Sequence, residues 1–131
     1  MASVIGLGSI STAAATTGNI SITADGDVSL LNPIAASGTG AGNVSISTTS
    51  GSVITLGEVT SSGTLTLDAD DVETNLTANV TAGNFDMTGT AGVRTIGADV
   101  VIDATGAVAL EGGSFSHAAG TGSIATDSVS I

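Results

Sequence analysis

Carboxylates are the side chains of this sequence that could take part in chemistry. Their densest groups are two short stretches, LDADDVE (67–73) and ADGDV (24–28). Strand alternation would place the two acids of ADGDV on one side of the chain, and Ca²⁺ binds several oxygen ligands of this kind. The residues of this candidate calcium site are Asp25, Asp27, Asp68, Asp70 and Asp71. The other interpretation is that these acids are solvated in turns, because the calcium-binding repeat GGxGxDxUx is absent.

Catalysis would need more than these acids. Enzymes that cleave sugars with paired carboxylates also need basic and aromatic groups to hold the sugar. This chain has Arg94 as its one Lys or Arg, and it has no Trp or Tyr. His117 could serve a Ser-His-Asp arrangement, but no nucleophile turn accompanies it. We therefore expect a non-enzyme with no cofactor apart from the candidate calcium, and we expect His117 to lie in a surface loop.

Charge restricts the partners. Twelve Asp and Glu residues against one Arg give a formal net charge of −11, which repels phosphate backbones and anionic membranes. We expect no nucleic acid partner. No apolar run approaches the roughly 20 residues of a membrane span, so we expect no membrane insertion either. Cysteine is absent, which excludes disulfides and thiolate metal sites.

The elements that would position these side chains are short strands. Apolar and polar residues alternate in NISIT, NVSIS, TLTLD, NFDMT and AVALE, and Gly, Ser, Asn and Asp fill the segments between them. Alternation of this kind predicts strands with one buried face, and the intervening residues favour tight bends. The short alanine run near the N-terminus is too brief for a stable helix. We expect an all-β protein with little or no helix.

The alternating units recur at nearly constant intervals. Glycines that open them, at positions 18, 42, 63, 83 and 106, are 24, 21, 20 and 23 residues apart. This period predicts a parallel β-solenoid of about five or six coils, each of roughly 20–24 residues. It would form a single domain over residues 1–131 or a segment of a longer shaft. The segment from Asn32 to Ala41 is expected to be a loop that absorbs the variation. An antiparallel β-sandwich is the alternative, with a hairpin at Asp25-Gly26.

A solenoid would stack equivalent residues of successive coils at about 4.8 Å. Two interior columns are then expected. The first contains Ile20, Val44, Leu65, Phe85 and Val108, and the second contains Ile22, Ile46, Leu67, Met87 and Leu110.

Four asparagines begin Asn-x-Ser/Thr sequences, namely Asn19, Asn43, Asn75 and Asn79. These are either glycan acceptors or structural residues. Asn19 and Asn43 both follow a unit-opening glycine, so stacking would align their amides for hydrogen bonding along the solenoid.

The units GNISITADGDVSL and GNVSISTTSGSVITL resemble the repeats of filamentous haemagglutinin-like exoproteins, the large secreted adhesins of Gram-negative bacteria. The resemblance spans roughly residues 18–116. It implies a right-handed parallel β-helix shaft that is exported to the cell surface for adhesion or biofilm formation. Asn32-Pro33 is the one trace of the Asn-Pro motifs in the secretion domain of that family, and it lies inside a repeat.

We expect an extracellular, non-catalytic structural or adhesive protein, with any export signal outside this chain. A module that binds glycans or calcium at the surface is the alternative. Alternation continues almost to both termini, from SVIGLGSIS to SIATDSVSI. Open strand edges at the ends would pair either with a continuation of a longer chain or head to tail with another copy. Host or matrix glycans are further expected partners.

Overall fold

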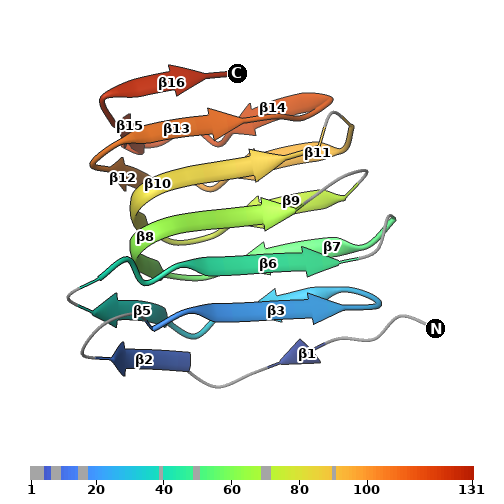
Figure 1. Ribbon diagram of the computed structural model, residues 1–131. Helices are drawn as coiled ribbons and strands as arrows, with labels where there is room; N and C mark the ends of the chain where they lie inside the picture. Colours follow the sequence, from blue (N-terminus) through green and yellow to red (C-terminus); the bar gives the residue numbers. More distant parts are fainter. Residues whose placement is uncertain are drawn as a thin grey trace.

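The computed structural model describes residues 5–6, 10–14, 18–38, 40–48, 51–68, 72–89 and 91–131. The described part of the chain contains strands and no helix, and all of its strand pairs are parallel. Successive coils lie on top of one another from the N-terminal to the C-terminal end (Figure 1). The fold is therefore the predicted β-solenoid, and the antiparallel sandwich is excluded.

One side of each coil belongs to a six-stranded sheet. Along the solenoid its strands are β1 (Ile5–Gly6), β4 (Val28–Leu30), β7 (Val53–Leu56), β9 (Glu73–Leu76), β11 (Val93–Ile96) and β14 (Ser114–His117).

A ten-stranded sheet forms the rest of each coil. Most coils contribute two strands to this sheet. These pairs are β2 (Ile10–Ala14) and β3 (Ile20–Ala24), β5 (Ile34–Gly38) and β6 (Val44–Thr48), β12 (Val101–Ala104) and β13 (Ala107–Leu110), and β15 (Ser123–Ala125) and β16 (Ser128–Ser130). In the two central coils they merge into the single strands β8 (Val59–Asp68) and β10 (Val80–Thr88). The pairing between β8 and β10 shifts near Gly63 and Gly83, where both strands bend.

Both predicted interior columns are confirmed by the register. Phe85 pairs with Leu65 on one side and with Val108 on the other. The remaining steps of the two columns are aligned in the same way through β3, β6 and β8. Most members are fully buried, whereas Ile22, in the first coil, is half-buried. Branched and unbranched aliphatic side chains thus fill a narrow core that every coil shares with its neighbours.

The expectation of a loop from Asn32 to Ala41 is wrong for Ile34–Gly38, which forms β5. Ile34 and Ala36 are buried there, and the small alanine hides the alternation in the sequence. The extra residues of this coil lie after the strand. Ala36 and Val44, eight residues apart, pair with Ser61 and Leu65, which are four apart.

Candidate functional site

The described candidate calcium residues lie at one corner of the solenoid but in different coils. Asp25 and Asp27 lie in the turn between β3 and β4, and Asp68 ends β8. The Asp27 Oδ1 atom accepts a hydrogen bond from the Val53 N–H of the next coil, at 2.9 Å. Asp70 and Asp71 lie outside the described residues. Within the described residues no three His, Cys, Asp or Glu side chains gather as a metal site, so calcium binding stays a prediction.

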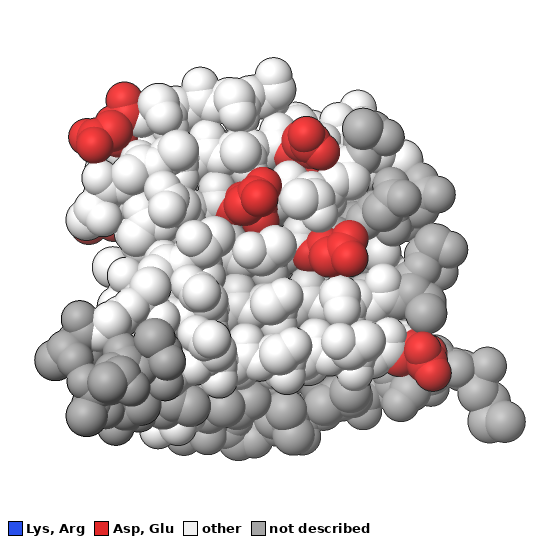
Figure 2. Space-filling view, in the orientation of Figure 1, with Lys and Arg blue, Asp and Glu red and all other residues white. Residues whose placement is uncertain are grey.

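Acidic side chains elsewhere are also dispersed. On the face that β6, β8 and β10 form, the carboxylates stand apart among neutral side chains (Figure 2). Asp86 and Glu111 belong to different coils of this face. Such spacing keeps the surface strongly negative without gathering ligands around one point.

Asparagines at one corner of the solenoid connect three pairs of successive coils. Asn19 Oδ1 accepts the Asn43 N–H at 3.0 Å, and Asn43 Oδ1 accepts the Thr64 N–H at 2.8 Å. Asn84 Oδ1 accepts the Ala107 N–H in the same way, at 2.9 Å. These oxygens accept hydrogen bonds from backbone N–H groups at bends, where the regular hydrogen bonding between strands is interrupted. The repeated Gly-Asn sequence therefore has a structural use at this corner.

Two unit-opening glycines that are not themselves followed by asparagine are explained by the asparagine of the preceding coil. A Cβ atom at Gly63 would overlap Asn43 Oδ1, and a Cβ at Gly106 would overlap Asn84 Oδ1. The asparagine side chain of one coil thus passes under the glycine of the next. Both residue types recur visibly in the sequence, but their contact across coils could not be predicted from it.

We predict that Gly63 and Asn43 are energetically coupled. Gly63→Ala should destabilise the protein by about 1–3 kcal/mol because its methyl group overlaps the amide. Asn43→Ala should cost about 1 kcal/mol by leaving the Thr64 N–H without its acceptor. In the double variant the methyl group has more room, so the combined loss should be smaller than the sum by about 0.5 kcal/mol or more. Urea unfolding of the four proteins measures this difference, and strict additivity would contradict the contact.

A second corner uses an aspartate in the same role. Asp99 has a positive φ of 62°, a backbone conformation that Asp and Asn adopt more readily than most residues. Its Oδ1 atom accepts the N–H of Thr121 at 2.7 Å and the hydroxyl of Thr121 at 2.9 Å. The backbone hydrogen bond, aided by the hydroxyl, lowers the pKa of Asp99 below its ordinary 3.8. Asp99, Glu58 and Asn79 line a shallow hollow of about 290 Å³.

A lowered pKa makes the Asp99 contribution to stability depend on pH in a defined direction. It should be present above the ordinary value of 3.8 and lost as the pH falls through the lower value of the folded state. We expect an NMR titration to give Asp99 a pKa below the ordinary value of 3.8, and Thr121→Ala to bring it closer to that value. A pKa of Asp99 at or above 3.8 would contradict its hydrogen bonds to Thr121.

Arg94 lies inside the solenoid and is 1% exposed. It occupies an inward position of β11, in register with Thr74 and Phe115. Its Nε donates to the Glu111 carbonyl at 2.9 Å, and its terminal nitrogens donate to the carbonyls of Gly89, Ala91 and Val72. The guanidinium is thus occupied by backbone oxygens and inaccessible to a substrate. Sequence reasoning missed this role because arginine is rarely fully buried.

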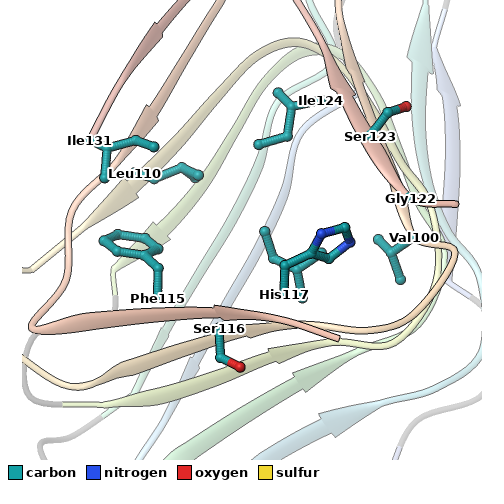
Figure 3. Close-up of a pocket in the computed structure, with 10 residues that line it drawn as sticks. Val100, Leu110, Phe115, Ser116, His117, Gly122, Ser123, Ile124 and Ile131 are labelled. Carbon is teal, nitrogen blue, oxygen red and sulfur yellow. The ribbon is translucent and has the colours of Figure 1, made fainter. Parts of the chain in front are cut away.

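His117 is exposed in β14 rather than in a loop, which corrects the expectation for this residue. It belongs to the inward column of Leu76 and Ile96. Its side chain points into a hollow at the C-terminal end together with those of Phe115 and Ile124 (Figure 3).

The hollow has a volume of about 410 Å³. Its lining residues are Ile96, Val100, Leu110, Phe115, Ser116, His117, Gly122, Ser123, Ile124 and Ile131. The Ser116 side chain points away from it (Figure 3). Among these described residues His117 carries the one ionisable side chain, and a single imidazole among aliphatic groups does not form a nucleophile and base pair. Chemically the hollow is an apolar opening of the core.

The described residues include no helix of the length and apolarity that crossing a membrane requires. Comparisons of the chain with protein-family models, with curated proteins and with solved structures find no match.

Proposed function

We propose that this chain is a non-catalytic structural protein, either a β-helical shaft or a self-assembling filament, that acts outside the cell in surface attachment or biofilm formation. The observation that carries the proposal is the use of its polar side chains. Asn43, Arg94 and Asp99 all bond to the backbone of neighbouring coils. Side chains that could do chemistry elsewhere serve coil stacking in this protein.

Two further features support a structural role outside the cell. The repeated units resemble those of filamentous haemagglutinin-like exoproteins, whose β-helix shafts present adhesive regions at the bacterial surface. The net charge of −11 keeps a repetitive protein with open strand edges soluble through mutual repulsion. A stacked core of this kind extends by adding coils, because each coil contacts only its neighbours.

Surface display tests the proposed function. The chain would be anchored on a non-adherent bacterium, and attached cells would be counted under flow on glass and on matrix proteins. We expect several-fold more attached cells than with the same anchor alone. The matched control displays an equal amount of Arg94→Ala, which should fold poorly. Equal attachment for all three strains would contradict the proposal, and retention on one defined glycan alone would favour a glycan-binding module instead.

A further inference from the structure

The sequence has one position at which a protease that recognises a cationic side chain could cut. Arg94 is its one Lys or Arg among 131 residues. A trypsin-class protease cleaves the peptide bond after such a residue, because a specificity pocket next to its catalytic serine holds the side chain. The bond between Arg94 and Thr95 is therefore the single candidate bond for this class of enzyme in the sequence.

The residues around this bond suit such an enzyme. The segment GVRTIG (92–97) has no Asp or Glu, although the chain has twelve of them. A carboxylate in the segment would be repelled by the acidic group with which the specificity pocket binds arginine. By its sequence the segment is a favourable substrate, so the fold decides whether the bond is cut.

The fold withholds the Arg94 side chain from a specificity pocket. The side chain is 1% exposed, and its guanidinium donates to the carbonyls of Val72 and Glu111 in neighbouring coils. Two glycines let the backbone enclose it closely. A Cβ atom would lie 2.9 Å from Arg94 Nη1 if placed on Gly92, and 2.8 Å from Arg94 Cγ if placed on Gly112. To enter a protease, the guanidinium must leave the carbonyls of both adjacent coils.

The backbone around the bond is paired on both of its edges. β11 lies between β9 and β14 in the six-stranded sheet. Thr95, directly after the bond, is in register with Asn75 of β9 and Ser116 of β14. A protease takes its substrate as a single extended segment whose backbone groups are free to pair with the enzyme. β11 must therefore separate from its neighbouring strands before the bond can be cut.

We propose that the bond between Arg94 and Thr95 is a cryptic cleavage site for an arginine-recognising protease. Stacked coils protect the bond, and separation of β11 exposes it. The site goes beyond the proposed attachment role, because it follows from the burial of Arg94 alone.

The cut is a hydrolysis that prevents restacking. The oxygen of water joins the Arg94 carbonyl carbon to give a carboxylate, and both hydrogens go to the Thr95 nitrogen to give an ammonium group. Two new charges inside a paired sheet are costly to remove from water, so a cut coil does not return to its place. Opened copies of the chain are thus destroyed, whereas stacked copies persist.

Digestion of the intact chain with trypsin tests the protection. Cleavage of a folded protein follows the population of its open form when opening and closing are faster than the cut. We expect the folded chain to be cut at least about 1,000-fold more slowly than a synthetic peptide of residues 91–98. Mass spectrometry should identify the products as residues 1–94 and 95–131. Cleavage of the folded chain as fast as the peptide would overturn the proposal.

Two neighbouring glycines test whether the enclosure of Arg94 controls the cut. Gly112→Ala places a methyl group against the Arg94 side chain from the next coil and leaves the recognised segment unchanged. It should raise the rate of cleavage after Arg94 at least about tenfold. Gly113→Ala is the matched control, because its nearest contact is at 3.3 Å and is not with Arg94. Equal rates for Gly112→Ala and the unchanged chain would contradict the protection by enclosure.

An arginine at an exposed bend keeps the test independent of stability. Ala119 is exposed between β14 and β15, and exposed loops are preferred sites of proteolytic cleavage. Ala119→Arg should be cut after residue 119 at least about 100-fold faster than the folded chain is cut after Arg94. Ala119→Gln, which has no charge, should resist trypsin as the unchanged chain does. Equal resistance of Ala119→Arg would mean that the whole surface excludes trypsin, and the special protection of Arg94 would then be refuted.

Discussion

Phe85→Ala is expected to lower the free energy of unfolding by about 3–5 kcal/mol. Phe85 is 1% exposed and lies in a central coil between Leu65 and Val108. Its removal leaves a cavity that the flanking coils cannot close, because their own strands are held in register on both sides. Urea unfolding followed by circular dichroism measures the loss. Phe85→Leu should cost less than about 1.5 kcal/mol, since leucine refills most of the volume.

The other phenylalanine of the chain is a matched control. Phe115 is 38% exposed in the last coil, so Phe115→Ala removes a side chain that is already partly in water. Its cost should be about 1–2 kcal/mol, well below that of Phe85→Ala. Equal losses for the two variants would contradict the placement of Phe85 in the core and of Phe115 at an open end. Stability in a solenoid comes from interfaces between neighbouring coils. The cavity of Phe85→Ala should therefore also make the coils on its two sides unfold in separate transitions.

The two interior columns could be predicted from the sequence because each repeated unit has the same local pattern. Two inward residues follow a glycine at a fixed distance in every unit, so aligning the glycines aligns the core. The corner between Ala36 and Val44 lengthens one coil without disturbing this alignment. The alternation within each strand and the spacing of the repeated units predict the same inward positions. A structure is predictable from its sequence where local and long-range signals agree in this way.

The six-stranded sheet was less predictable. Val28 pairs with Ile54 twenty-six residues later, whereas Ile54 pairs with Thr74 after twenty. Variable corners before β7 change the spacing, so no single period aligns these strands. Two of the inward residues, Thr74 and Arg94, are polar. Binary patterning assigns such residues to the surface, and only the position of neighbouring carbonyls reveals that Arg94 belongs inside.

The candidate sites were predictable to different degrees. The structural use of Asn43 followed from its position after a repeated glycine. The contact between Asp99 and Thr121 did not, because it depends on a corner whose backbone has a positive φ. The hollow at the C-terminal end could not be located from alternation alone, since His117 interrupts an otherwise aliphatic column. The repeat predicts the features that all coils share. The roles of residues that occur in one coil only, such as Asp99 and His117, become clear from the structure.

Arg94→Ala is expected to destabilise the protein by about 3–5 kcal/mol, from lost hydrogen bonds and lost packing together. The guanidinium joins carbonyls from three coils: Val72 before it, Gly89 and Ala91 at its own corner, and Glu111 after it. Removing the side chain leaves the buried Val72 oxygen and three partly buried oxygens without their donors, and it opens a cavity beside β11. Urea unfolding measures the loss. Val93→Ala, one residue away on the exposed side of the strand, should change stability by less than about 0.5 kcal/mol.

Two further substitutions separate hydrogen bonding from packing. Arg94→Met keeps a long side chain but has no donor, so its loss should remain above about 2 kcal/mol if the carbonyls matter. Arg94→Lys keeps the charge, yet its single ammonium cannot reach carbonyls that surround a planar guanidinium on several sides. We expect lysine to recover less than half of the loss. Wild-type stability of Arg94→Met would mean that the side chain acts by filling space, and the coils would then be joined at this corner by packing alone.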